Sequence, residues 1–235
     1  MTVAWCTSMQ AMGGMPMPGG WTMSMAWMRM PGQTWPGAAA SFGAMWMVMM
    51  AAMMLPSLVP MLWRYRQVVH DRTPRPGVRT ALAGAGYFSV WAAVGMAVFP
   101  LGLWLAGMEM RHPALARAVP LAAGVVVLAA GAFQLTAWKA RYLACCRASP
   151  EPLPAGRRAA WRHGLRLGLH CVRSSGGLMA ILLAAGIMNL GVMTLVAAAV
   201  TAERLAPAGE RVARATGMVI AAAGLLLMGR AAWLG

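Results

Sequence analysis

The stretch FGAMWMVMMAAMMLPSLVPMLW, from Phe42 to Trp63, decides the fold class of this chain. It contains no charged residue, and it is long enough to cross a bilayer, because a spanning helix needs about 20 apolar residues. Six methionines fall within its first thirteen residues: Met45, Met47, Met49, Met50, Met53 and Met54. The stretch therefore predicts a transmembrane helix with an unusual supply of thioether sulfur.

The composition of the whole chain agrees with membrane insertion. Of its 235 residues, 60% are hydrophobic and 11% are charged, and the mean hydropathy is +0.61. Soluble domains have about 25% charged residues. The net charge of +15 comes from arginine clusters between apolar runs, which is the pattern that sets membrane topology. We therefore expect a lipid bilayer, and not nucleic acid, to be the partner of these charges.

The apolar runs predict an all-α, polytopic membrane protein with about five transmembrane helices, at residues 42–63, 80–105, 115–138, 176–200 and 215–234. The basic segment RRAAWRHGLRLGLHC, which precedes the fourth run, predicts an additional amphipathic helix at the membrane interface. Residues 1–41 are rich in Met, Trp, Gly and Pro. They predict a periplasmic or interfacial segment that lies on the membrane or folds back over the transmembrane domain, residues 42–235.

The distribution of Lys and Arg predicts the orientation. The loops after the first and third spans, with the C-terminal end, hold 14 of these residues, and the remaining segments hold 6. The positive-inside tendency places the richer set in the cytoplasm, so the N-terminal segment is expected outside and the C-terminus inside. Five spans with an outside N-terminus need a translocation signal. Either the first span inserts unaided, or MTVAWC is the end of a further helix, which would make six.

Methionine is the first candidate for chemistry, because thioether sulfur is a soft ligand that suits Cu(I). Sixteen of the 24 methionines lie in the first 61 residues. The N-terminal segment holds M-x-M pairs such as Met15 with Met17 and Met23 with Met25. Methionine also fills irregular helix interfaces, so packing explains a stripe on the first span without any ligand. Exposed methionines in the N-terminal segment have no such explanation.

These patterns predict a copper site on the outer side of the membrane. The predicted ligands are Met15, Met17, Met23, Met25, Met45, Met49, Met50, Met53, His112 and Met188. Asn189, predicted in the middle of the fourth span, needs a polar partner such as Gln134 or Ser89, or else a ligand. Glu203 is expected at the outer interface and not in the core.

A second group of residues lies on the side predicted to be cytoplasmic: Cys145, Cys146, His163, His170 and Cys171. Adjacent cysteines do not chelate one ion as C-x-x-C does, and the spacing of a zinc site is absent. Buried or interfacial thiols are the expectation here, and a cytoplasmic metal-transfer site is the alternative.

Several runs together resemble a known bacterial family. They are the Met-rich run from Met12 to Trp63, then GAFQLTAWKARYLACCR, LRLGLHC and GIMNLGVMTLVAAAVTAER. This combination is similar to the predicted metal-binding integral membrane proteins, a domain of unknown function. The resemblance implies metal binding in the bacterial inner membrane. Similar members often have paired cysteines where Ser174 and Ser175 stand here, which weakens a thiolate site at that point and leaves the methionines.

The leading functional hypothesis is copper handling, with copper as the bound metal. One alternative is a non-catalytic accessory subunit of a larger membrane complex, suggested by small-residue faces at Gly84, Gly86 and Gly95 that permit close helix approach. Another is a component of a membrane metallo-oxidoreductase, which would need more nitrogen or carboxylate ligands. The chain has no P-loop, GxSxG or HExxH motif, so we do not expect an enzyme.

Overall fold

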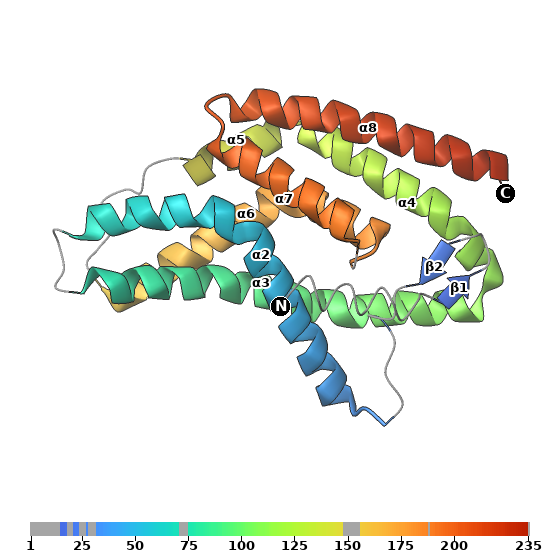
Figure 1. Ribbon diagram of the computed structural model, residues 1–235, viewed down its shortest axis with the longest axis horizontal. Helices are drawn as coiled ribbons and strands as arrows, with labels where there is room; N and C mark the ends of the chain where they lie inside the picture. Colours follow the sequence, from blue (N-terminus) through green and yellow to red (C-terminus); the bar gives the residue numbers. More distant parts are fainter. Residues whose placement is uncertain are drawn as a thin grey trace.

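The computed structural model describes residues 15–17, 21–23, 27, 32–70, 75–147, 156–187 and 189–234 (Figure 1). Within these residues the protein consists of seven helices and one short hairpin. The helices are α2 (Trp35–His70), α3 (Pro76–Arg111), α4 (Pro113–Gln134), α5 (Ala137–Arg147), α6 (Arg157–Ala185), α7 (Leu190–Leu205) and α8 (Gly209–Leu234). The hairpin pairs β1 (Met15–Met17) with β2 (Trp21–Met23). The all-α class is confirmed, with the hairpin as an addition.

Five of these helices, α2, α3, α4, α6 and α8, are long and apolar enough to cross a membrane. Their outward surfaces keep large apolar side chains exposed, such as Leu226 at 70% and Trp233 at 92%, as a lipid-facing surface does. Helix α2 includes the whole stretch from Phe42 to Trp63, and it bends in the region of Pro56 and Pro60 (Figure 1).

The third span ends earlier than the sequence predicts. Helix α4 stops at Gln134, and the hydroxyl of Thr136 donates to the carbonyl of Phe133 at 2.7 Å. The same hydroxyl oxygen accepts a hydrogen bond from the backbone N–H of Lys139 at 3.3 Å. Thr136 thus satisfies a free backbone donor at the start of α5, as an N-cap does, and the chain changes direction there.

The predicted fourth span, residues 176–200, is wrong. Its first half continues the basic segment in a single helix, α6, which runs from Arg157 to Ala185. Gly186 follows with a φ of 97°, which favours glycine. Asn189 then caps a new helix, α7, where its side-chain oxygen accepts from the N–H of Val192 at 3.1 Å. Asn189 is exposed and stands at a helix start, not in the middle of a span.

This break reverses the chain once more than the five-span prediction allows. Helices α6 and α7 form a hairpin, and α8 then runs antiparallel to α4, with Gly124 beside Met228 and Gly131 beside Ala221. The end of α8 therefore lies at the same end of the bundle as the β-hairpin (Figure 1). The distribution of Lys and Arg in the sequence, by contrast, placed the N-terminal segment and the C-terminus on opposite faces of the membrane.

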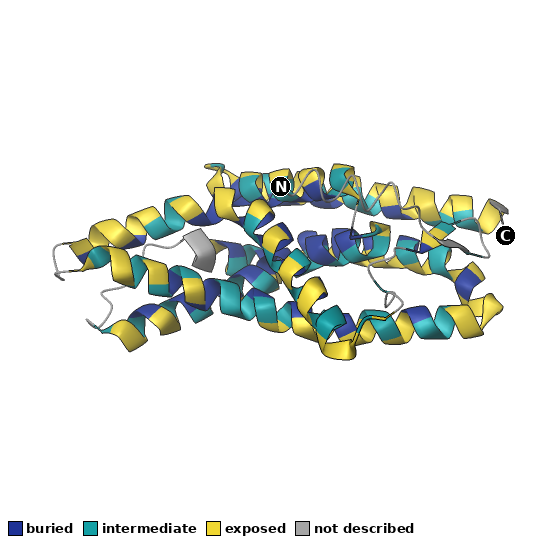
Figure 2. Ribbon diagram, turned by 60° about the horizontal axis from the view of Figure 1, so that its bottom comes forward, coloured by how far each residue is buried: buried dark blue, intermediate teal, exposed yellow. Residues whose placement is uncertain are grey.

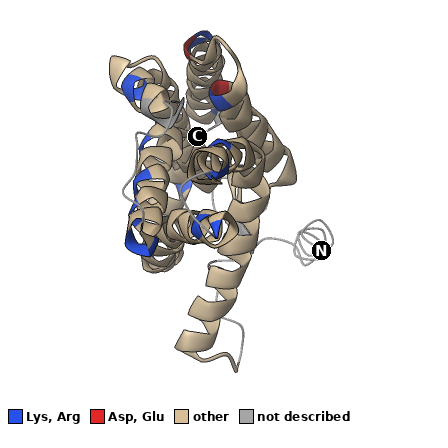
Figure 3. Cartoon of the chain, turned by 90° about the vertical axis from the view of Figure 1, so that its left-hand side faces the viewer, with Lys and Arg blue, Asp and Glu red and all other residues tan. Residues whose placement is uncertain are grey.

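The arrangement sharpens the charge asymmetry. The structure describes the side chains of seventeen Lys and Arg residues, and thirteen of them belong to the end where α2 meets α3, α5 meets α6 and α7 meets α8, while Arg173 lies near the middle of α6. Only Arg111, Arg117 and Arg230 belong to the end that carries the β-hairpin. Figure 3, viewed toward the basic end, shows the Lys and Arg positions, coloured blue, spread over several helices there.

Glycines allow the helices to approach closely. A Cβ on Gly164 would overlap the carbonyl oxygen of Ala83, and a Cβ on Gly86 would lie 2.6 Å from the carbonyl oxygen of Trp161. These two glycines lock α3 against α6. Gly95 likewise gives room to the ring of Trp46. The glycine faces that suggested a partner subunit are thus used inside this chain, and the buried residues form a core between the helices (Figure 2).

Candidate metal centre

Four methionines of α2 face the centre of the bundle. Met49, Met50, Met53 and Met54 are at most 5% exposed, because positions one, four and five residues apart share one side of a helix. They belong to the same core as Met179 of α6 and Met193 of α7. The core of the protein is therefore rich in thioether sulfur from three helices.

A contact between two sulfur atoms in this core joins α2 to α6. The Sγ of Cys171 lies 3.9 Å from the Sδ of Met54, and both side chains are fully buried. Metal–sulfur bonds are about 2.3 Å long for zinc thiolates, so two sulfurs that share an ion of similar size lie within about 4.6 Å of each other. The pair thus fits two soft ligands of one ion without a large movement of either helix.

Polar groups surround the thiol of Cys171. The hydroxyl of Tyr87 on α3 lies 2.9 Å from its Sγ, and the hydroxyl of Ser175 lies 3.7 Å away. Either atom of the contact between Tyr87 and Cys171 can be the donor, and a cysteine binds a metal as its thiolate. Both Ser174 and Ser175 donate to the backbone carbonyl of Cys171, at 3.1 and 2.7 Å. These serines therefore support the cysteine that precedes them.

The structure gathers some of the predicted ligands and separates others. Met49, Met50 and Met53 lie in the core, and Met45 is half-buried against it. Met23 is buried in β2 but does not belong to that core. Met25 and Met188 lie outside the described residues. The predicted set thus divides into a core group and a group that belongs to the N-terminal segment.

The N-terminal group lies at the corner between α3 and α4. Trp21 donates from Nε1 to the carbonyl of Ala116 at 2.8 Å, so the β-hairpin folds back over the start of α4. His112, which is exposed, precedes α4 at the same corner. In the hairpin, Met15 pairs with Met23, and Met17 is half-buried. These contacts agree with one of the two arrangements expected from the sequence, in which the N-terminal segment folds back over the helices.

Sequence reasoning missed three members of the core site: Met54, Cys171 and Tyr87. Met54 belongs to the helical stripe of α2 and follows Met50 by four residues, so the periodicity alone would have included it. Cys171 was assigned to a cytoplasmic loop because the basic segment was separated from the span. Once α6 is a single helix, Cys171 lies in its middle and faces α2 and α3.

A second buried cluster is made of charged groups. Lys139 of α5 and Glu203 of α7 form an ion pair at 2.8 Å, and Gln134 donates from Nε2 to Glu203 at 2.9 Å. Beside them, Arg204 donates to the hydroxyl of Ser174 at 3.3 Å. The expectation that Glu203 is an interface residue is wrong, since it is 2% exposed. Gln134 binds this acid and not Asn189.

The two histidines of the predicted cysteine and histidine group contact aromatic rings. His163 stacks on Tyr65 of α2, with ring centroids 4.9 Å apart, whereas His170 lies 6.0 Å from the ring of Tyr142 on α5. The side chains of Cys145 and Cys146 are outside the described residues. Among the residues that were described, no group of three His, Cys, Asp or Glu side chains could hold a metal. A metal site built from the described residues would therefore need methionine sulfur.

Comparison with known proteins gives one finding. The sequence model of the PpoB2 family, described as a copper chaperone, matches residues 43–227. A search of curated proteins and a search of solved structures found no significant match. The resemblance to a metal-related family is thus supported, but its description as a domain of unknown function is replaced by a copper chaperone family. Since the match covers most of the chain and all the helices of the core, this protein belongs to the PpoB2 family of copper chaperones.

Proposed function

We propose that this protein is a membrane-embedded chaperone that carries Cu(I) on sulfur ligands inside its helix bundle. The observation that carries the proposal is the buried contact of 3.9 Å between Cys171 and Met54. Membership of a copper chaperone family supports the choice of metal. Soft thiolate and thioether ligands select Cu(I) over hard ions, which prefer oxygen.

The other methionines extend this inner pair. Met49, Met50 and Met53 share its core, and Met45 packs against the core closer to the start of α2. An outer group at the corner of α3 and α4 would receive the ion first, and it consists of Met15, Met17, Met23 and His112. The remaining two predicted ligands, Met25 and Met188, lie outside the described residues. A series of weak binding sites along one path suits a carrier, because an ion that must be passed on has to leave each site.

The orientation follows from the charges. The basic end of the bundle faces the cytoplasm under the positive-inside tendency, and the β-hairpin and the end of α8 face the periplasm of the bacterial inner membrane. Copper would therefore enter from the hairpin side. This assigns the periplasmic side to the β-hairpin and to the end of α8, in place of the cytoplasmic C-terminus that the sequence predicted.

The test is Cu(I) binding by the detergent-purified, reduced protein. We expect the wild type to retain Cu(I) against a competing chelator, and the variants Met54→Leu and Cys171→Ser to lose at least about tenfold in affinity, since each removes a ligand at almost constant volume. Met96→Leu and Met218→Leu are the matched controls, because both methionines are more than half exposed. Unchanged affinity in both core variants would refute the inner site.

A further inference from the structure

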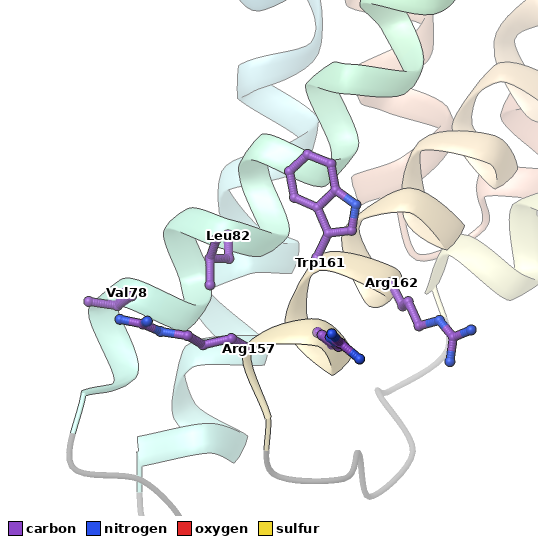
Figure 4. A pocket seen from close by; sticks show the side chains of 6 residues that line it. Val78, Leu82, Arg157, Trp161 and Arg162 are labelled. Carbon is purple, nitrogen blue, oxygen red and sulfur yellow. The ribbon is translucent and has the colours of Figure 1, made fainter.

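An open groove lies at the basic end of the bundle, between the first turns of α3 and the first turns of α6 (Figure 4). Its volume is about 600 Å³, and its lining consists of Val78, Leu82, Arg157, Arg158, Trp161 and Arg162. Neither the copper chaperone assignment nor the sulfur core accounts for this groove. Its lining combines two chemistries, a set of guanidinium groups and an apolar wall.

The charge of the groove is entirely positive within the described residues. Three of its six lining residues are exposed arginines, and none is acidic. They occupy the first turns of α6. The N-cap residue there is Gly156, which has no side chain to cap the helix, and the first turn contains no acidic residue. Cations at a helix N-terminus oppose the helix dipole. A bound anion would therefore be stabilised in this groove.

The apolar wall makes a free inorganic anion a poor match. Val78 and Trp161 are 42% and 38% exposed, and Leu82 is partly exposed beside them. Figure 4 shows the side chain of Arg157 extended beside Val78, while the ring of Trp161 stands over the gap between the two helices. Both α3 and α6 are candidate membrane spans that begin here, so this wall lies at the depth where lipid chains meet headgroups.

We propose that this groove binds an anionic phospholipid. Its phosphate would lie among the guanidinium groups of Arg157, Arg158 and Arg162, and an acyl chain would cover Val78, Leu82 and Trp161. Basic pockets between transmembrane helices on the cytoplasmic side bind such headgroups, and arginine presents a planar set of donors that matches phosphate oxygens. The inference rests on the membrane-embedded fold and is independent of copper.

The experiment compares lipid retention by native mass spectrometry of the full chain released from detergent. The probes are dioleoyl phosphatidylglycerol and dioleoyl phosphatidylcholine, which have the same acyl chains and differ in net charge. We expect the wild type to retain phosphatidylglycerol at least about fivefold better than phosphatidylcholine. The double variant Arg157→Gln with Arg158→Gln should lose this preference, since two of the three guanidinium groups are removed.

The matched control is the double variant Arg211→Gln with Arg214→Gln. These exposed arginines of α8 lie at the same end of the bundle but not in the groove, and the variant changes the net charge equally. It should retain the wild-type preference. A third variant, Trp161→Ala, keeps all the arginines but removes part of the apolar wall. It should weaken the retention of phosphatidylglycerol.

Three results would overturn the proposal. The first is equal retention of both lipids by the wild type. The second is an equal loss of the preference for phosphatidylglycerol in the two double variants. The third is full displacement of phosphatidylglycerol by millimolar inorganic phosphate. The last result would assign the groove to a free anion. A melting temperature close to that of the wild type in each variant shows that the helices remain folded.

Discussion

The Nζ of Lys139 lies 2.8 Å from the Oε2 of Glu203, in an ion pair whose two side chains are 1% and 3% exposed. The sequence placed the lysine in a cytoplasmic loop and the glutamate at the outer interface. Their contact shows that α5 and the end of α7 meet at one end of the bundle. This buried ion pair joins α7 to α5, and the hydrogen bond from Gln134 to Glu203 joins α7 to α4 as well.

Removing the acid of this pair should destabilise the fold. Glu203→Gln takes away the negative charge beside a buried lysine, and breaking a buried pair in this way costs about 3–5 kcal/mol. A double variant, Lys139→Met with Glu203→Leu, should restore most of the stability, because it leaves no uncompensated charge. Thermal unfolding in detergent measures both. Glu210→Gln is the control, since Glu210 is exposed on α8, and a loss as large in that variant would contradict the argument.

The contact between α3 and α6 should be intolerant of a single methyl group. A Cβ on Gly164 would overlap the carbonyl oxygen of Ala83, so Gly164→Ala must separate two backbones and should cost about 1–3 kcal/mol. Gly176→Ala is a control on the same helix. No atom lies within 4 Å of the Cβ it would add, and the higher helix propensity of alanine should stabilise the protein by up to about 1 kcal/mol. Chemical unfolding should show a lower free energy of unfolding for Gly164→Ala and a higher one for Gly176→Ala, each relative to the wild type.

Hydrophobic length was sufficient to predict most of this fold from the sequence. The helices around residues 42–63, 80–105 and 215–234 are present because apolar runs of this length have one stable form in a bilayer. The break between α6 and α7 was not predicted, since hydropathy averages over a window and does not detect a local break. The relevant signal was the glycine at Gly186 followed by a capping residue at Asn189, a stop and a start three residues apart.

The candidate site was predicted only on α2, where helical periodicity orders the methionines. The partners of these methionines could not be derived in the same way. Cys171 reaches Met54 across 117 positions of the chain, and Tyr87 comes from a third helix. Contacts between helices depend on rotation and crossing position, which here depend on glycines such as Gly86 and Gly164. A periodicity within one segment contains no information on these quantities.

The additional reversal at Gly186 predicts which positions share a side of the membrane. With Cys6, Cys145 and Cys146 replaced by serine and the buried Cys171 retained, single cysteines at His112 and Trp233 should react with the same membrane-impermeant maleimide in intact cells. A cysteine at Arg211 should react only after permeabilisation, because the start of α8 lies at the opposite end of the bundle. All three positions are exposed. Labelling of positions 112 and 233 from opposite sides would restore the five-span topology.

The two methionine groups should contribute separately to copper binding. A variant with leucine at Met15, Met17, Met23 and Met25 removes thioethers of the N-terminal group, while the pair of Met54 with Cys171 is untouched. We expect the variant to bind fewer Cu(I) ions in total and to retain the tightest one, because sites without shared ligands behave additively. Combining it with Met54→Leu should remove that ion as well. If the N-terminal variant alone abolished the tight site, the two groups would form one centre, with the β-hairpin supplying ligands to the core.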